Sequence, residues 1–346
     1  MTARHTTIFP AACLLLAAFL LPLSCTKQEG PSPADDSDEI RISVGLPEAS
    51  APTKTTYQTV ESLNSDGSTI AVVAYKTGTA TPSFTDNATY SASGSKWTFG
   101  TTRYWSDAGG NLDFFAYYPA TPASACVTVG TYAAGAPTFS CANLPLTSDA
   151  QLDTLNEFVF AFEADKGNLT GSSTGNTVDL TFHRPFARVY FRIQRSIPCT
   201  LKALTITSTG SVKIKNSGTC TCSSTSPYCT WNTSGSTSDD FVITLNGETG
   251  LAYPSQIGQG SYFGSQKGYL VLPQSLSEDI KVRLSYTDSG GDHIAETTLG
   301  GADVSWQAGY SYIYDLDIQG GSDAVQLGVT VTAWANGGSV VTTVEE

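Results

Sequence analysis

The dominant pattern from residue 39 onward is an alternation of apolar and polar side chains with a period of two. The alternation is clearest in six segments, at 40–44, 112–118, 187–194, 280–286, 310–318 and 325–333. Successive side chains of a β-strand point to opposite faces, so each segment is predicted to be a strand with one buried and one wet face. Turn-forming clusters rich in Gly, Asn and Asp separate the strands, at 64–67, 107–111, 289–292 and 336–338. Almost no segment has a helical period, and the pattern therefore predicts an all-β protein.

The length of 346 residues suggests about two domains, at the usual size of roughly 100–200 residues for each. The loose polar run 166–177 supplies a border, which we place at 182/183. This border separates a first domain, 39–182, from a second, 183–346. Regularly spaced strands with Gly-rich turns are typical of sandwiches or barrels.

The net charge of the chain argues against one class of binding partner, the nucleic acids. The chain has 31 acidic and 18 basic side chains, a formal net charge of −13. Nucleic-acid binding needs a basic surface, so DNA and RNA are not expected as partners. A charged content of only 14% and an aromatic content of 10% also argue against a disordered chain.

The N-terminus reads as an export signal, residues 1–24, with an apolar stretch that is too short for a confident membrane span. Its end, Pro22-Leu23-Ser24-Cys25, resembles a bacterial lipoprotein box. Cleavage before Cys25 would leave that cysteine to carry acyl chains such as palmitate, and more than one chain gives stable anchoring. The alternative is an ordinary signal peptide that is cut nearby. Residues 25–38 are rich in Pro and Asp and are predicted to be a flexible tether.

Six cysteines remain outside the signal and the lipid site, and an even number in an exported protein predicts disulfides without giving their pairing. Cys126 and Cys141 are 15 residues apart, and a bridge between them would contribute about 3 kcal/mol. The other four are in the second domain, and three of them resemble a metal knuckle only loosely because no His is nearby. We therefore favour disulfides over metal for this set: Cys126, Cys141, Cys199, Cys220, Cys222 and Cys229.

Few residues are available for catalysis. Loss of the signal leaves only His183 and His293 as histidines. The segment 171–175 satisfies the pattern G-x-S-x-G, but it is in a Ser/Thr/Gly linker that no helix follows. Asp315 and Asp317 share one strand face, which we interpret as solvated. The sequence therefore predicts no enzyme, no cofactor and no metal site.

Five segments together resemble the fimbrillins of the Bacteroidales, the Mfa-like subunits of surface fimbriae. They occur in order over nearly the whole chain, at 51–57, 104–119, 178–189, 270–274 and 306–334. The resemblance implies two tandem transthyretin-like β-sandwich domains after the lipoprotein signal peptide, with no enzymatic activity. It also implies an outer-membrane lipoprotein that becomes part of a fimbrium (pilus) at the cell surface and contributes to cell adhesion.

The resemblance further implies assembly by strand exchange, with other fimbrillin subunits as partners. In this family an Arg- or Lys-specific protease removes the first strand, and a strand of the next subunit fills the groove. The removable strand would be 39–44, with Ile40, Ile42 and Val44 facing the core. The donor would be 325–344, with Val325, Leu327, Val329 and Val331; the alternative is that this strand pairs only within its own domain. The loop after the first strand carries Lys54 where the family has Arg, so Lys54 is the candidate cleavage site, and Thr154 is a candidate O-glycosylation site.

Two other functions stay open. A fimbrial tip or accessory adhesin would bind a glycan or a host protein, and an aromatic side chain such as Trp231 could serve it. A surface lipoprotein that binds or degrades glycans is the other alternative. An adhesin should lack a donor strand that engages another copy, and an enzyme should show a cleft with two carboxylates. The residues leave open whether a fimbrial subunit of this kind forms the stalk, the tip or the anchor.

Overall fold

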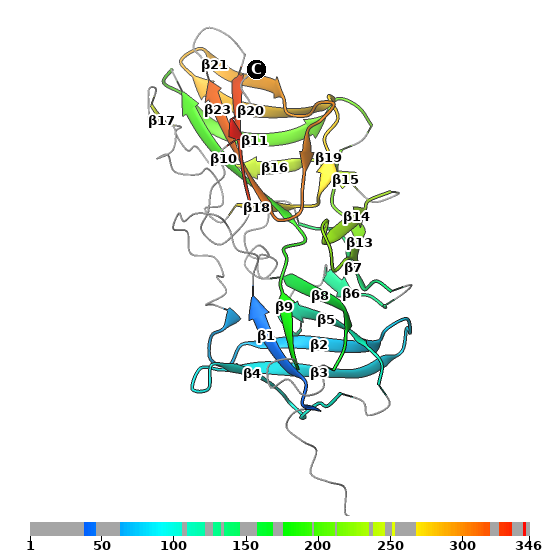
Figure 1. The fold of residues 1–346 in the computed structure, drawn as a ribbon. Coiled ribbons are helices and arrows are strands. Elements are labelled where there is room, and N and C mark those ends of the chain that lie inside the picture. The colour runs from blue at the N-terminus through cyan, green and yellow to red at the C-terminus, as the bar shows by residue number, and fades with distance from the viewer. Residues whose placement is uncertain are drawn as a thin grey trace, which may run out of the picture. The chain divides into compact units, whose positions relative to one another are not determined.

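The elements that the structure describes are β-strands (Figure 1), which confirms the all-β prediction. The computed structural model describes residues 38–45, 63–105, 109–121, 127–132, 135–145, 158–168, 176–195, 197–211, 213–234, 238–245, 251–252, 268–318, 325–333 and 342–343. Among these residues no helix is long and apolar enough to cross a membrane.

The first large sheet has five antiparallel strands in the order β4-β3-β2-β5-β8. Their bounds are β2 (Thr69–Lys76), β3 (Pro82–Ser91), β4 (Lys96–Phe99), β5 (Leu112–Tyr118) and β8 (Val159–Lys166). Strand β5 does not have the wet face that its alternation predicts, because Asp113 and Phe115 are buried as well as Phe114. Phe114 belongs to one hydrophobic cluster and Phe115 to another, so side chains cover the sheet on both faces.

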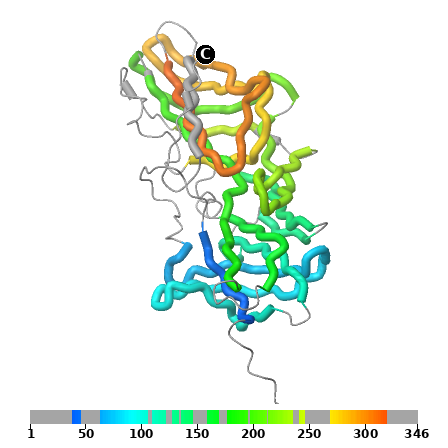
Figure 2. Tube along the Cα trace, viewed as in Figure 1, coloured from blue at the N-terminus to red at the C-terminus, as the bar shows by residue number. Residues whose placement is uncertain are grey.

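One of these two clusters, the first cluster, lies between the five-stranded sheet and a pair of parallel strands. The pair consists of β1 (Arg41–Gly45) and β9 (Thr177–Thr181), which are far apart in the sequence but lie side by side (Figure 2). The first cluster combines apolar side chains of both layers, among them Ile40, Ile42, Val44, Val72, Phe114, Val178, Leu180 and Phe182.

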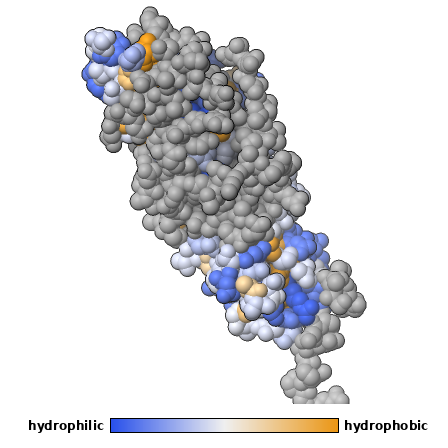
Figure 3. Space-filling view, turned by 90° about the vertical axis from the view of Figure 1, so that its left-hand side faces the viewer, coloured by the Kyte–Doolittle hydropathy of each residue, from blue (hydrophilic) through white to orange (hydrophobic). Residues whose placement is uncertain are grey.

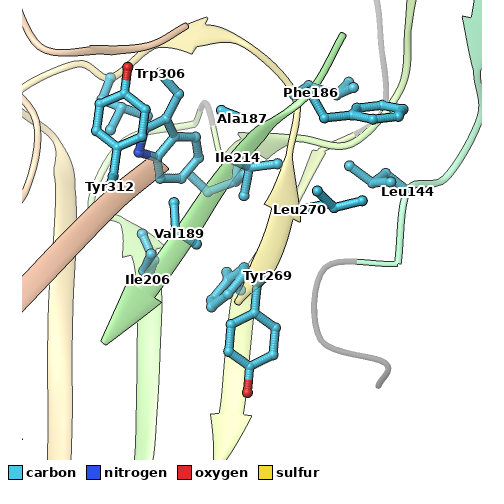
Figure 4. Close-up of a cluster of buried hydrophobic side chains, with 14 of the residues drawn as sticks. Leu144, Phe186, Ala187, Val189, Ile206, Ile214, Tyr269, Leu270, Trp306 and Tyr312 are labelled. Atoms are coloured by element: carbon cyan, nitrogen blue, oxygen red, sulfur yellow. The ribbon is translucent and has the colours of Figure 1, made fainter. Parts of the chain in front are cut away.

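Two further sheets have their apolar side chains in the second cluster (Figure 4). One has the order β17-β10-β23-β24-β25, with β18 also paired to β10, and its bounds are β10 (Ala187–Arg195), β17 (Leu251–Ala252), β18 (Tyr269–Val271), β23 (Tyr310–Ile318), β24 (Val325–Ala333) and β25 (Thr342–Thr343). The other has the order β16-β11-β20-β21, with bounds β11 (Thr200–Ser208), β16 (Phe241–Thr244), β20 (Ile280–Asp288) and β21 (Gly291–Thr298). In the second cluster the Trp306 Nε1 donates to the Tyr314 hydroxyl at 2.7 Å, so the buried indole has a partner.

A four-stranded sheet of order β14-β13-β7-β6 joins strands from the two halves of the sequence. Its bounds are β6 (Val127–Val129), β7 (Thr138–Cys141), β13 (Gly218–Cys222) and β14 (Cys229–Asn232). Two short pairs complete the strands: β12 (Ile214–Lys215) with β15 (Ser238–Asp239), and β19 (Gln274–Ser275) with β22 (Ser305–Trp306). Because β7 and β13 are on opposite sides of 182/183, the border and the two tandem domains stay a prediction.

The polar side chains of β10 and β23 are not on a wet face. The Arg192 guanidinium donates from Nε and Nη2 to the two carboxylate oxygens of Asp315, at 2.6 and 2.5 Å. The two side chains are only 10% and 16% exposed. Asp317 Oδ1 is buried as well. The interpretation of Asp315 and Asp317 as solvated is therefore wrong: Arg192 lies on the adjacent strand and compensates the Asp315 charge.

Candidate functional site: the groove of strand β1

Strand β1 and Ile40, the residue that precedes it, insert three apolar side chains into the first cluster. Ile40, Ile42 and Val44 are 2%, 6% and 8% exposed, whereas Arg41 between them is exposed. This alternation places one face of β1 against the core and the other toward solvent. The structure thus puts these side chains where a core-filling strand needs them, and their exchange for another strand stays a prediction.

The backbone of β1 is held mainly along one edge. It runs parallel to β9 in a register from Arg41 opposite Thr177 to Gly45 opposite Thr181. At the two ends of this edge Arg41 N donates to the Asn176 carbonyl at 2.9 Å, and Phe182 N donates to the Gly45 carbonyl at 2.7 Å.

The opposite edge is paired where β1 begins. Ile40 N donates to the Arg103 carbonyl at 2.8 Å, and Trp105 N donates to the Asp38 carbonyl at 2.9 Å. Residues 103–105 therefore form a second wall of the groove that β1 occupies. Sequence analysis singled out Tyr104 and Trp105 as part of a family resemblance but missed this role, because it depends on contacts across more than 60 residues.

An ion pair fixes the second wall. Arg103 Nε and Nη2 donate to Asp86 Oδ2 at 3.0 and 2.8 Å, and the guanidinium lies 5.0 Å from the centroid of the Phe84 ring. Burial opposes the charge of Asp86, but hydrogen bonds from Arg103 and from the backbone of Asn87 and Thr101 lower the pKa of the carboxyl below its usual value. The second wall is thus anchored to β3 by a charge-assisted contact that β1 does not share.

The floor of the groove is aromatic and partly polar. Trp105 contacts the Phe114 ring edge-to-face, with centroids 5.8 Å apart. At the far end the Trp97 Nε1 donates to Asn64 Oδ1 at 2.8 Å, and the Asn64 Nδ2 lies 3.5 Å from the Val44 carbonyl oxygen. If β1 left, Asn64 would still hold Trp97, so this end of the groove has a support that is independent of the strand.

The candidate donor strand lies in a sheet of its own chain. Strand β24 is antiparallel to β23, from Ile318 opposite Val325 to Tyr310 opposite Ala333, and β25 pairs with its other edge. The structure of the single chain therefore has the arrangement that we gave as the alternative, and the donation of this strand to another copy stays a prediction.

The remaining candidate residues do not form a catalytic centre in the described part of the chain. His183 stacks on Tyr228, with ring centroids 3.6 Å apart, and His293 contacts Asp288 at 2.9 Å on a strand-end turn. Burial lowers the pKa of His183 to about 4. The described residues contain no group of three or more side chains that could hold a metal ion.

A shallow cavity of about 580 Å³ lies away from the groove. Its lining includes Trp231, Lys213, Lys215, Gln274, Ser275 and Asp279. Trp231 Nε1 donates to the Pro185 carbonyl at 2.7 Å, which orients the indole. On the face drawn in Figure 3 the coloured residues are mainly hydrophilic, with small scattered hydrophobic areas.

The described part of the chain contains none of the predicted disulfides. Cys220, Cys222 and Cys229 are present as thiols, with Cys222 directly opposite Cys229. Several other predicted features lie outside the described residues: the signal peptide 1–24, Cys25, the tether up to residue 37, Lys54, Cys126, Thr154 and the segment 171–175.

Comparison with solved structures shows the fold. A fimbrial protein from Bacteroides vulgatus is similar with a TM-score of 0.60 and 15% identity, over 86% of this chain and 100% of that one. A candidate cell adhesion protein from Bacteroides eggerthii has a TM-score of 0.52 and 12% identity, over 88% of this chain and 98% of that one. No curated protein matches the chain in sequence.

A sequence model described as fimbrillin-like matches residues 53–334, which is most of the chain. This match confirms the resemblance inferred from the five sequence segments. The chain therefore belongs to the fimbrillin-like family.

Proposed function

We propose that the protein is a structural subunit of a surface fimbria and polymerises when a strand from a neighbouring subunit replaces β1. The observation that carries the proposal is the position of β1: the strand and the preceding Ile40 supply three buried side chains to the first cluster, and β1 is paired to β9 along one edge. A groove of this kind accepts an incoming strand through backbone hydrogen bonds, and side-chain pockets at every second residue select the register.

The two walls of the groove differ in how far they depend on β1. Arg103 on one side is held by Asp86, and β9 on the other side packs Val178 and Leu180 into the first cluster. The Arg103–Asp86 contact does not involve β1, whereas β9 pairs with β1 in a two-stranded sheet. An incoming strand would therefore meet one wall that is already formed, which lowers the ordering cost of binding, and would take over the pairing with β9.

We propose 325–344 as the donor segment and a cut after Lys54 as the trigger. Lys54 falls between β1 and β2 in the sequence, so the cut would separate β1 from the rest of the chain without touching either strand. The proposed route begins with export, lipidation at Cys25 and attachment to the outer membrane. Incorporation into a fimbrium that contributes to adhesion follows, and no step needs enzymatic activity of this chain.

Limited proteolysis tests the proposal. The chain without the signal and the lipidated cysteine, residues 26–346, is treated with trypsin at limiting dose, and the products are examined by unboiled gel, mass spectrometry and negative-stain microscopy. We expect loss of a fragment that ends at Lys54, together with ladders or filaments. The Lys54→Gln variant is the matched control and should stay intact and monomeric.

Two results would overturn parts of the proposal. A clean cut at Lys54 that leaves only monomers, also after addition of a 325–344 peptide, would refute polymerisation by strand replacement. Ladders that form equally well from the Lys54→Gln variant would refute the trigger.

The cavity beside Trp231 favours one second candidate, an adhesin that binds a glycan. An indole ring packs against the apolar face of a sugar, and two lysines line the same cavity: Lys215, and Lys213, whose amine pairs with Asp240 at 3.0 Å and would have to exchange that partner for an acidic group of the glycan. Screening of the uncut chain on a glycan array tests this function, with the Lys213→Gln variant as the control. Binding that this variant lacks would support the adhesin, and absence of binding to acidic glycans would refute it.

A further inference from the structure

Three cysteine thiols meet on the hairpin of β13 and β14. Cys222 lies directly opposite Cys229, and Cys220 lies opposite Trp231. Residues two apart on a strand share a face, so the Cys220 and Cys222 side chains are on the same side of the hairpin as Cys229 and Trp231. The spacing in the sequence shows that these cysteines are near one another, but only the register shows which two are opposed.

The hydrogen bonds define the type of this pair. Ser223 N donates to the Tyr228 carbonyl at 2.7 Å, so the adjacent pair, Cys222 with Cys229, is a non-hydrogen-bonded pair of the antiparallel ladder. Cys222 N points the other way and donates to the Pro137 carbonyl at 2.9 Å, beside β7. The directions of the Ser223 and Cys222 N–H groups thus indicate independently that Cys222 and Cys229 form a non-hydrogen-bonded pair.

A non-hydrogen-bonded pair has the geometry that a disulfide needs. Its Cα atoms are about 4.5 Å apart, which is within the range of roughly 4.4–6.8 Å that disulfides span. Cys220 is diagonal to Cys229, and diagonal neighbours are about 7–8 Å apart, so it is less well placed for a bond to the same partner. Cys220 is nevertheless in contact with the other two sulfurs: burial and hydrogen bonds with Cys222 and Cys229 raise the pKa of its thiol.

The three thiols also differ in access to solvent. Cys220 and Cys222 are 0% and 1% exposed, whereas Cys229 is only partly buried. An oxidant that arrives from solvent would therefore meet Cys229 first. This order matters because thiol–disulfide exchange requires the attacking sulfur to reach the sulfur of the oxidant.

We propose that Cys222 and Cys229 form a cross-strand disulfide in the exported protein, while Cys220 stays a thiol beneath it. The oxidant is a disulfide-bearing thiol oxidase or a small-molecule disulfide. The Cys229 thiolate attacks one sulfur of that disulfide, forms a mixed disulfide and releases the first thiol. The Cys222 thiolate then attacks Cys229 Sγ and releases the second thiol. The hairpin loses two protons and two electrons, and the oxidant gains them as two thiols.

The bond would fasten a hairpin that contacts a distant part of the chain. Tyr228, next to Cys229, stacks on His183, and Trp231 packs against Phe139 and Phe186. Those contacts hold the hairpin to β7 and to the segment that leads into β10. The disulfide would therefore lock the tip of the hairpin at the place where His183 meets it, and this function is separate from the exchange of β1.

The test uses thiol titration and peptide mapping of the mature chain in glutathione redox buffers. Oxidation should remove two hairpin thiols from the wild type and from the Cys220→Ser variant, as counted on the mapped peptides, and chymotryptic cleavage after Tyr228 should leave peptides joined by a bond that reduction breaks. Fragmentation of the joined wild-type peptides should place the bond on Cys222 rather than on Cys220. The Cys222→Ser variant should need a markedly more oxidising buffer to lose its two remaining hairpin thiols, Cys220 and Cys229.

Two results would overturn the inference. One is a bond mapped to Cys220, or an equally ready oxidation of the Cys222→Ser and Cys220→Ser variants. The other is the persistence of all three thiols in wild-type protein at the oxidised end of the buffer series. The fragmentation map of the wild type is decisive even if a variant fails to fold.

Discussion

Replacement of Ile42 by Ala tests whether β1 contributes to the core of the first cluster. Ile42 is 6% exposed and lies opposite Val178 of β9 in the register. The substitution removes buried apolar atoms and leaves the backbone pairing of β1 intact. Arg41→Ala is the matched control, because Arg41 is on the same strand and its side chain is 47% exposed.

The two substitutions should differ clearly in cost. Removal of a buried Ile side chain down to Ala costs about 2–5 kcal/mol, because transfer energy is lost and a cavity forms. We expect about 3 kcal/mol for Ile42→Ala, since β1 is an outer strand and the site can partly collapse. The ion pair of Arg41 with Glu39, at 3.5 Å, is exposed, and exposed pairs contribute about 0–1 kcal/mol.

Urea unfolding followed by circular dichroism measures both costs, and thermal unfolding gives a second estimate. A loss of about 3 kcal/mol should lower Tm by roughly 4–5 °C in a chain of this size. After the cut at Lys54, the same variant should also release β1 faster than Arg41→Ala does. Equal costs for the two variants, or a cost of Ile42→Ala below about 0.5 kcal/mol, would refute the assignment of β1 to the core.

Three further predictions concern buried polar groups. Arg192→Leu should lower the free energy of unfolding in urea by about 3–5 kcal/mol, because it leaves the Asp315 carboxylate buried and unpaired. A second change in the same chain, Asp315→Leu, should restore part of this loss, and no recovery would contradict the pairing. Tyr132→Phe should cost about 1–3 kcal/mol, since the Tyr132 hydroxyl donates to the buried Asp113 carboxylate; a cost near zero by the same assay would contradict it. Burial lowers the pKa of His183 from 6.5 to about 4, so the unfolded chain binds the proton more readily than the folded chain. The free energy of unfolding should therefore fall as the pH drops from 6.5 to 4, by at most about 1.4 kcal/mol per pH unit. The His183→Gln variant should show a flatter dependence on pH, and an unchanged dependence would refute the assignment to His183.

The alternation of side chains identified strands that cover one face of a core, and it missed strands that are covered on both faces. Strand β2 is a continuous apolar run, in which Val72 faces the first cluster and Val73 the second. A run of this kind has no period of two. It becomes recognisable only when a second layer is known to cover the sheet.

The solvent exposure of charged side chains was predicted wrongly for a related reason. Arg192 and Asp315 are 123 residues apart, and nothing in the local sequence pairs them. The sequence alone gives the polarity of each residue, so both were assigned to solvent. The parallel register of β10 and β23 places them opposite each other, and that register is a property of the assembled sheet.

The buried face of β1 could be predicted from the sequence, but the residues that form the walls of its groove could not. The alternation at 40–44 showed which side chains of β1 would be buried, because burial of one strand face follows from local sequence. The wall at Arg103 and the support of Trp97 by Asn64 involve segments that only the fold brings together. The hairpin thiols could be predicted in part. Their spacing in the sequence shows that they are near one another, but only the register of β13 and β14 shows that Cys222 lies opposite Cys229.

The burial of β1 restricts how it can leave. Exposure of Ile40, Ile42 and Val44 would cost about 1.5–3 kcal/mol for each side chain, or roughly 5–9 kcal/mol together. Single domains are stable by only about 5–15 kcal/mol, so a first cluster with an empty groove would retain little of its stability. Departure of β1 is therefore favourable only if an incoming strand occupies the groove as it is vacated. Pairing along one edge suits this requirement, because an incoming strand can begin to pair with β9 at one end while β1 still fills the other. The same apolar side chains that make β1 costly to remove would thus make a groove without a strand short-lived, and in the proposed route they would favour assembly over a stable cleaved monomer.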